Sequence, residues 1–222
     1  MNRAALIRNR LETLRAEVAG RAKIIAVSKY YPASDILLAY EANQRDFGES
    51  RVQELQQKAA ELVHLDIIWH FIGHLQTNKI RALFNIKGLG AIHAVDSVKL
   101  FEAMLKEEAL LSAPLEFFIQ VNTSTEPQKH GLTSCNEVQA LIDKIEQASP
   151  KRLILKGLMT MGPADSENFD QKTERCFQDL ALFREGLKRP NLGLSMGMSQ
   201  DFRLALAYGS AALRIGSLLF KS

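Results

Sequence analysis

The segment KIIAVSK (residues 23–29) is a short apolar run that ends in a lysine. Seven further runs of similar length follow it along the chain: RDFGES (45–50), IIWHFIG (67–73), AIHAVD (91–96), LEFFIQVN (115–122), LILKGLMTMG (153–162), NLGLSMG (191–197) and ALRIGS (212–217). Their length and their content of Val, Ile and Phe predict eight β-strands.

Segments with helical spacing separate these runs, at residues 36–42, 52–62, 98–111, 137–148, 167–187 and 202–208. Strict alternation of this kind is typical of parallel βα units. Eight such units in 222 residues predict an α/β fold, a single (β/α)8 TIM barrel that forms one domain over residues 1–222. A doubly wound open sheet is the alternative.

The N-terminal segment carries Leu6, Ile7, Leu11, Leu14 and Val18 on one helical stripe. We therefore expect an additional helix that covers the barrel wall beside the short last segment. Arginines interrupt this stripe, so it does not resemble a signal peptide.

The composition excludes several classes of protein. The 28 Lys and Arg residues against 25 Asp and Glu leave a net charge of +3, too little for a nucleic-acid-binding surface. No apolar run is long enough to span a membrane. The two cysteines, Cys135 and Cys176, cannot form a disulfide framework. We expect a cytoplasmic monomer without nucleic-acid or membrane partners.

Lys29 closes the first predicted strand. In a parallel barrel the active site lies where strands end, so its ammonium would stand over the barrel mouth. Desolvation and nearby cations can lower the pKa of such a lysine, which makes Lys29 a candidate for imine formation. The alternative is an ordinary strand-end lysine that extends into solvent.

The last two predicted strands end in SMGMS (195–199) and RIGS (214–217). Loops at these places usually form the phosphate site of a (β/α)8 barrel. Gly197 permits close backbone approach, Ser199 and Ser217 supply hydroxyl groups, and Gly216 supplies an amide. Alternatively, the glycines form tight turns and the serines cap the following helices.

Arg214 shares a strand face with Gly216, because side chains alternate with a period of two. Its guanidinium could therefore enter the barrel. Facing a pyridine nitrogen, it would donate a hydrogen bond and keep that nitrogen unprotonated, which weakens the ring as an electron sink. A structural salt bridge inside the barrel is the alternative.

The histidines do not indicate a metal site. His70 and His74 are four residues apart, but a strand end and a glycine turn separate them. His64, His93 and His130 have no evident partner in the sequence. Asp96 and Ser97 are expected to cap the helix that begins at residue 98.

Seven ordered motifs together resemble the YggS/PROSC family, the pyridoxal phosphate homeostasis proteins, whose barrel is similar to the N-terminal domain of alanine racemase. The motifs are AVSKYYP (26–32), FGESRVQE (47–54), WHFIGHLQTNK (69–79), QVNTSTEPQKHGL (120–132), KGLMTMGP (156–163), LSMGMSQD (194–201) and RIGSLLF (214–220). They cover nearly the whole chain.

The resemblance implies a bound pyridoxal 5′-phosphate (PLP), joined to Lys29 as a Schiff base. The phosphate would be held by Ser199, Gly216 and Ser217. The resemblance further implies that Met198 lies beside the cofactor, that Arg214 faces the pyridine nitrogen, and that His70 and Phe71 line the pocket wall. Two positions depart from the family pattern: Ser50 replaces an Asn that contacts the ring, and Ser217 replaces a Thr.

The implied role is PLP homeostasis without catalysis, with PLP-dependent apoenzymes as candidate recipients. A weak amino-acid racemase and a cofactor-free lysine aldolase are the alternatives. Racemisation needs an acid-base group opposite the lysine, which alanine racemases take from a second domain, and we expect none here because the chain ends soon after Ser217. Arg214 would also disfavour a stabilised carbanion.

Overall fold

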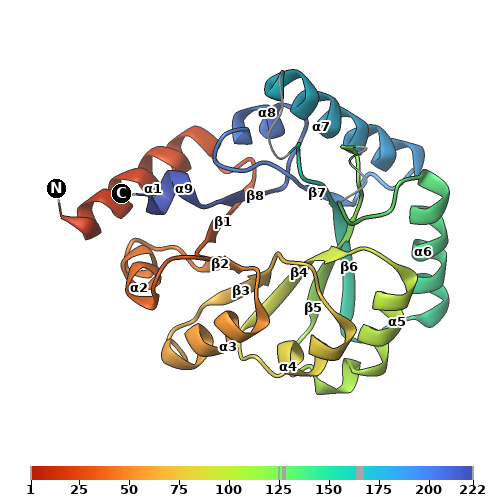
Figure 1. The fold of residues 1–222 in the computed structure, drawn as a ribbon, viewed down its shortest axis with the longest axis horizontal. Coiled ribbons are helices and arrows are strands. Elements are labelled where there is room, and N and C mark those ends of the chain that lie inside the picture. Colours follow the sequence, from red (N-terminus) through yellow and green to blue (C-terminus); the bar gives the residue numbers. More distant parts are fainter. Residues whose placement is uncertain (1, 125, 127–128, 164–167, 222) are drawn as a thin grey trace.

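A computed structural model describes residues 2–124, 126, 129–163 and 168–221 of the chain. Within these residues, eight parallel strands close into one barrel in sequence order (Figure 1). They are β1 (Lys23–Val27), β2 (Asp46–Glu49), β3 (Ile68–Phe71), β4 (Leu89–Val95), β5 (Leu115–Gln120), β6 (Leu153–Met159), β7 (Gly193–Ser195) and β8 (Ala212–Ile215).

The barrel closes where β1 pairs with β8, with Lys23 opposite Ala212 and Ile25 opposite Arg214. This pairing confirms the predicted (β/α)8 barrel, and the open-sheet alternative is wrong. The strands end earlier than several of the predicted runs, so Lys29, Gly216 and Ser217 lie just beyond the carboxyl ends of their strands.

The described helices are α1 (Arg3–Val18), α2 (Ala33–Glu41), α3 (Val52–Glu61), α4 (Ile80–Phe84), α5 (Val98–Lys106), α6 (Cys135–Ala148), α7 (Phe169–Gly186), α8 (Phe202–Ala207) and α9 (Ser217–Phe220), with 3-10 turns η1 (Thr77–Lys79) and η2 (Glu108–Leu110). The sequence missed η1, α4 and α9, since helices of five residues or fewer are too short for a periodic signal. The predicted helix at 98–111 splits into α5 and η2. Glu167, the expected start of the helix that corresponds to α7, lies outside the described residues.

Helix α1 is the predicted additional helix. Ile7, Leu11, Leu14 and Val18 are buried along one face, at the spacing of a packed helix. The side chain of Arg3 in α1 donates to the carbonyl of Phe220 in α9 at 2.6 Å. Helices α1 and α9 therefore lie side by side at one edge of the molecule (Figure 1). The beginning and the end of the chain therefore close the wall next to β1 and β8.

The strands separate an apolar layer outside the barrel from a more polar interior inside it. Side chains that point outward, such as Phe47, Trp69 and Phe117, pack in the apolar layer against the helices. Several side chains that point into the barrel are polar, among them His70, His93, Ser195 and Arg214, and all four are buried. Alternation along each strand produces this division.

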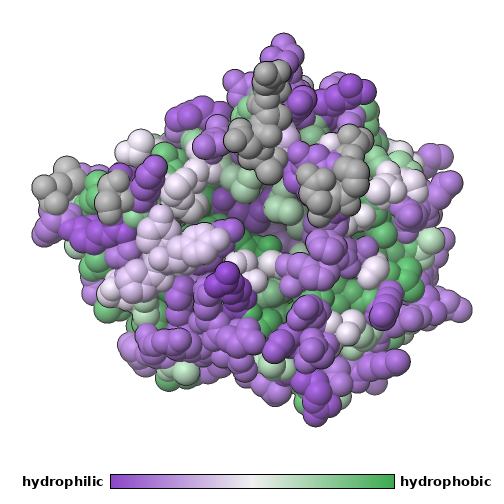
Figure 2. Space-filling view, viewed as in Figure 1, coloured by the Kyte–Doolittle hydropathy of each residue, from purple (hydrophilic) through white to green (hydrophobic). Residues whose placement is uncertain are grey.

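The outer face shown in Figure 2 is mostly hydrophilic, with smaller apolar patches between charged side chains. None of the helices in the described part of the chain is both long and apolar enough to cross a membrane.

Candidate functional site

A cavity of about 470 Å³ opens at the carboxyl ends of the strands. Its volume lies in the range of small-molecule pockets, about 300 to 1,000 Å³. Two other hollows have similar volumes of about 470 and 510 Å³, so the chemistry of the lining distinguishes this one. It brings together six residues predicted from the sequence: Lys29, Met198, Ser199, Arg214, Gly216 and Ser217.

Lys29 reaches the cavity from a tight turn. The amide of Tyr31 donates to the carbonyl of Ser28 at 2.9 Å, and Tyr30 has a φ of 78°, the sign that a type II turn requires at its third residue. A tyrosine seldom adopts this conformation, and such strain is common at functional sites. The turn points Lys29 inward along the cavity wall while Tyr30 is 77% exposed.

A buried ion pair supports this turn from below. Lys58 donates to the Glu49 carboxylate at 2.7 Å and to the carbonyl of Ser28 at 3.0 Å. The hydroxyl of Ser28 donates to the same carboxylate oxygen at 2.7 Å. The ends of β1 and β2 are thereby tied together directly behind Lys29.

Backbone amides converge at the end of the neighbouring strand β8, which pairs with β1. The N–H groups of Gly216 and Leu218 both donate to the Ser199 hydroxyl oxygen, each at 3.2 Å. A Cβ on Gly216 would meet the carbonyl oxygen of Val27 at 3.3 Å, so the residue permits a close approach of β8 to β1. Amide donors and a hydroxyl at one wall form a suitable site for an anion.

Gly197 has a different role from the one predicted, since it does not line the cavity. Its φ is 96°, and a Cβ there would lie 2.5 Å from Cβ of Ala205 and 2.9 Å from Cδ2 of Leu213. Gly197 therefore allows α8 to pack against β8, which holds Ser199 in place.

Arg214 is buried and lines the cavity. Its Nη1 donates to the carbonyl oxygen and the hydroxyl of Ser195 at 2.8 and 2.7 Å, and its Nη2 donates to the carbonyl of Thr160 at 2.8 Å. Among the described residues it forms no salt bridge, so the salt-bridge alternative is wrong. Burial lowers the pKa of Arg214 to about 10, and the group stays charged at neutral pH.

Sequence reasoning missed two charged residues of the cavity, Asp201 and Lys129. Asp201 directly precedes α8, accepts a hydrogen bond from the amide of Met198, and has one buried oxygen without a partner in the described part of the chain. Burial raises the pKa of Asp201. Its place before a helical segment was the available signal. Lys129 donates to the carbonyl of Gly162 at 2.7 Å, and nothing in its local spacing indicated a site.

Three predicted contacts, Ser50, His70 and Phe71, do not line this cavity. Phe71 points outward into the apolar layer between barrel and helices. His70 points into the barrel, below the cavity, where its Nε2 lies 2.9 Å from the Asp46 carboxylate. Ser50 follows β2 behind the wall, with its carbonyl against Gly73. Neighbouring strand positions face opposite sides, so His70 and Phe71 cannot both face one pocket.

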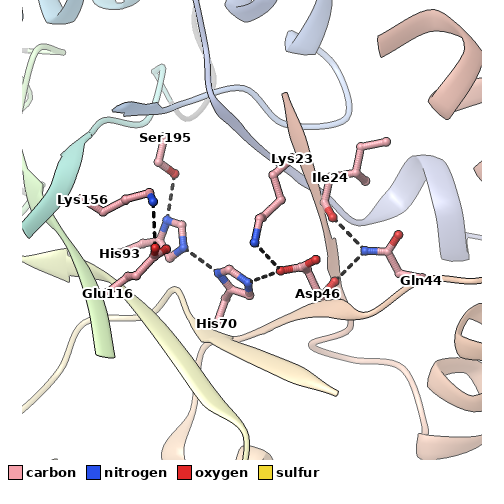
Figure 3. Close-up of polar contacts among 9 residues, drawn as sticks. All are labelled: Lys23, Ile24, Gln44, Asp46, His70, His93, Glu116, Lys156 and Ser195. Carbon is pink, nitrogen blue, oxygen red and sulfur yellow. Dashed lines mark hydrogen bonds and ion pairs between the residues drawn. The ribbon is translucent and has the colours of Figure 1, made fainter. Parts of the chain in front are cut away.

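His93 has partners that the sequence did not reveal. Its Nδ1 lies 2.8 Å from the Ser195 hydroxyl, and its Nε2 lies 3.0 Å from Nδ1 of His70 (Figure 3). The first bond crosses the barrel from β4 to β7, and the second joins β4 to its neighbour β3. A line of polar contacts therefore runs through the barrel beneath Arg214.

His74, Asp96 and His130 meet at the rim. Nδ1 of His74 lies 3.2 Å from the Asp96 carboxylate, and the rings of His74 and His130 stack at 4.0 Å with an angle of 16°. Nearly parallel rings cannot both direct in-plane lone pairs at one ion about 2 Å away, so this arrangement is not a formed metal site. Ser97 caps α5 as predicted, accepting from the amide of Leu100 at 3.2 Å.

The model of the alanine racemase N-terminal domain family matches residues 2–222. The pyridoxal phosphate homeostasis protein of Schizosaccharomyces pombe is 40% identical over 203 residues, covering 90% of this chain and 83% of the relative. The human protein of the same name is 40% identical over 210 residues, covering 89% of this chain and 75% of the relative.

Solved structures agree with these relatives. PipY of Synechococcus elongatus with PLP bound has a TM-score of 0.84 and 34% identity, covering 96% of this chain and 99% of PipY. Alanine racemase of Clostridium difficile, in complex with cycloserine, has a TM-score of 0.75 at 12% identity, which establishes a common fold; the match covers 97% of this chain and 59% of the racemase.

Proposed function

Since the chain belongs to the alanine racemase N-terminal domain family, and within it to the pyridoxal phosphate homeostasis proteins, we propose that it binds PLP and serves PLP homeostasis in the cytoplasm. The observation that carries this proposal is the cavity that Lys29, Arg214, Ser199 and Gly216 line together. PLP requires three features: an amine for its aldehyde, a hydrogen-bond donor to its pyridine nitrogen, and an anion site for its phosphate.

The residues present fit the cofactor. We assign the phosphate to the hydroxyl groups of Ser199 and Ser217 and to the amides of Gly216 and Leu218. In the structure these two amides both donate to the Ser199 hydroxyl oxygen. Met198 packs beside it. The acceptors that hold Arg214, Ser195 and Thr160, do not line the cavity, and we assign its remaining N–H groups to a ring nitrogen.

Lys29 supplies the covalent attachment. When bound, PLP would supply an aldehyde with which the neutral Nζ of Lys29 would condense to a Schiff base, with loss of water. An incoming amine would replace Lys29 at the same carbon, and Lys29 would take up a proton and return to the free amine. This exchange would release the cofactor to small amines or to PLP-dependent apoenzymes without any chemistry at an α-carbon.

Arg214 favours this role over racemisation. An electron sink is strongest when the pyridine nitrogen is protonated, and a charged guanidinium can only donate to that nitrogen. Lys29 is then the assigned proton carrier at the attachment point, and we expect no enzyme-like turnover of amino acids. Weak racemase activity is the competing function.

The test begins with the absorbance spectrum of the purified chain, before and after borohydride reduction. We expect an imine band that borohydride removes while fixing one cofactor to Lys29. The same preparation should reactivate a PLP-dependent apoenzyme. Solvent deuterium exchange at the α-carbon of L- and D-amino acids, at about 1 per second or faster, would establish catalysis instead. A chain that cannot be loaded with PLP would refute both functions.

A further inference from the structure

A continuous line of hydrogen bonds descends from Arg214 through the interior of the barrel. Figure 3 shows its lower part, from Ser195 to Lys23. From the cavity downward its members are Arg214, Ser195, His93, His70, Asp46 and Lys23. The successive distances are 2.7, 2.8, 3.0, 2.9 and 2.9 Å. The line begins at a buried cation and ends at an ion pair at the amino-terminal end of the barrel.

The donor at its upper end and the acceptor near its lower end determine which group donates each hydrogen bond of this line. Arginine only donates, so the Ser195 oxygen accepts from Arg214. Its hydroxyl hydrogen then goes to Nδ1 of His93. Nε2 of His93 must carry a proton and donate to Nδ1 of His70. Nε2 of His70 in turn donates to the Asp46 carboxylate, which only accepts when ionised.

The opposite direction is less favourable. His70 would have to carry two protons in order to donate to both His93 and Asp46. Ser195 would then accept from His93 as well as from Arg214, and no second acceptor for its hydroxyl hydrogen appears among the described residues. A buried donor without an acceptor is costly. Burial, with His70 and Arg214 nearby, also holds the pKa of His93 well below its usual range, in keeping with a neutral ring.

We propose that His93 and His70 are positioning residues for Arg214, because they keep the Ser195 hydroxyl hydrogen turned away from the guanidinium. With Nδ1 of His93 accepting that hydrogen, the Ser195 oxygen presents lone pairs to Nη1 of Arg214. Without it, the hydroxyl is free to turn its hydrogen toward Nη1 and oppose this contact. Arg214 then loses an anchor for the N–H groups that face the pyridine nitrogen.

This inference rests on the proposed PLP site, since it assigns the polar line a role in setting the state of the bound ring. The line contacts the cavity through Arg214, and His70 and His93 do not line the cavity. Their effect must therefore be indirect, and it should be visible in the cofactor without any turnover.

The experiment loads the full chain with PLP carrying ¹⁵N in the ring and records the ring-nitrogen chemical shift together with the rate of PLP loss. His93→Phe keeps a ring stacked on Phe118, whose centroid lies 4.5 Å from that of His93, and removes both nitrogens. We expect His93→Phe and Ser195→Ala each to move the resonance and to accelerate PLP loss roughly tenfold, the size of one hydrogen bond to a charged group.

Combining the two substitutions gives a sharper result. When Ser195 is Ala, no hydroxyl is left for His93 to direct. We therefore expect the double variant to match Ser195→Ala alone instead of adding the two effects.

Two matched variants separate positioning from general loosening of the barrel. Phe118→Leu removes the stacked ring but no member of the line, and we expect a lower melting temperature with an unchanged ring-nitrogen shift. His93→Asn keeps an acceptor near the place of Nδ1, and we expect it to retain most of the wild-type signal. If His93→Phe does not fold, His93→Asn and Ser195→Ala carry the same comparison.

The outcomes are distinguishable. A wild-type chain that takes up no PLP overturns the proposed function and this inference with it. A wild-type chain that loads normally, with His93→Phe and Ser195→Ala unchanged in ring-nitrogen shift, overturns this inference alone. A shift in Phe118→Leu as large as that in His93→Phe does the same.

Discussion

The mouth and the interior of the barrel treat their polar groups in opposite ways. At the mouth, Lys29, Ser199 and Ser217 line an open cavity, and Asp201 has a buried oxygen without a partner among the described residues. In the interior, His93 and His70 have a partner at each ring nitrogen. The cavity thus contains a polar atom without a protein partner, whereas both histidines beneath it are fully paired. Substitutions at the mouth should therefore change binding, and those beneath it should change stability or positioning.

Lys29→Ala should have the largest effect on binding and almost none on stability. The covalent attachment should be lost completely, because no other residue has been assigned that bond. The free energy of unfolding should change by about 0.5 kcal/mol or less, since the side chain lies outside the apolar core. Borohydride reduction followed by peptide mass spectrometry measures the first effect, and denaturant unfolding the second.

Lys129→Ala is the control for this prediction, because Lys129 lines the same cavity. The reduced cofactor should still be found on Lys29. Recovery of the label on Lys129 in the wild-type chain would reverse the assignment.

Gly197→Ala should lower the free energy of unfolding, because Gly197 lies in the close packing that supports the mouth of the barrel. The new methyl group would lie 2.5 Å from Cβ of Ala205, at a φ that alanine disfavours. Strain and overpacking together should cost about 2 to 5 kcal/mol. Thermal and denaturant unfolding measure this loss.

Gly209→Ala provides the matched comparison. Its φ is also positive, at 76°, but a Cβ there meets nothing within 4 Å. Backbone strain alone should cost about 1 to 2 kcal/mol. Equal losses at Gly197 and Gly209 would show that close packing at Gly197 is unimportant.

Ser199→Ala and Ser217→Ala should each weaken PLP binding roughly tenfold, because a hydrogen bond to a charged group is worth about 1.5 to 3 kcal/mol. Pyridoxal, which lacks the phosphate, should be affected much less. Equilibrium binding of both ligands to each variant tests the assignment. Equal weakening for PLP and pyridoxal would move the phosphate site elsewhere.

The smallest effect is expected at the lower end of the interior line. Burial by itself would raise the pKa of Asp46, but hydrogen bonds from His70 and Lys23 outweigh it and lower this pKa. The folded value lies below the unfolded one, so the stabilisation is complete above the unfolded pKa, near 3.9, and is lost as the pH falls through the folded value. Asp46→Asn should remove roughly 1 kcal/mol of stability at neutral pH.

The measurement is the melting temperature between pH 7 and pH 3. The gap between wild type and Asp46→Asn should close toward the acid end. Asp66→Asn, at an exposed position, is the control and should follow the wild-type curve. A gap that stays constant down to pH 3 would contradict the role of the Asp46 charge.

Local patterns in the sequence were sufficient for the barrel and for one wall of the site. Short runs rich in Val, Ile and Phe, which alternate with helical segments, predicted all eight strands of the barrel, and strand-end positions predicted the cavity residues Lys29, Ser199, Arg214 and Gly216. These features are local, because the length and composition of each run mark its own strand. The period of two along β8 also predicted that the Arg214 side chain points into the barrel, where it is buried and lines the cavity.

Tertiary structure alone decided what lies across the barrel. Ser195 and His93 are 102 residues apart, and their contact depends on the stagger that barrel closure imposes on β4 and β7. That stagger also puts His70 below the cavity instead of in its wall, and it brings Lys129 and Asp201 into the lining. Periodicity along one strand determines which side a residue faces, but the height at which it meets a distant strand is a property of the closed barrel.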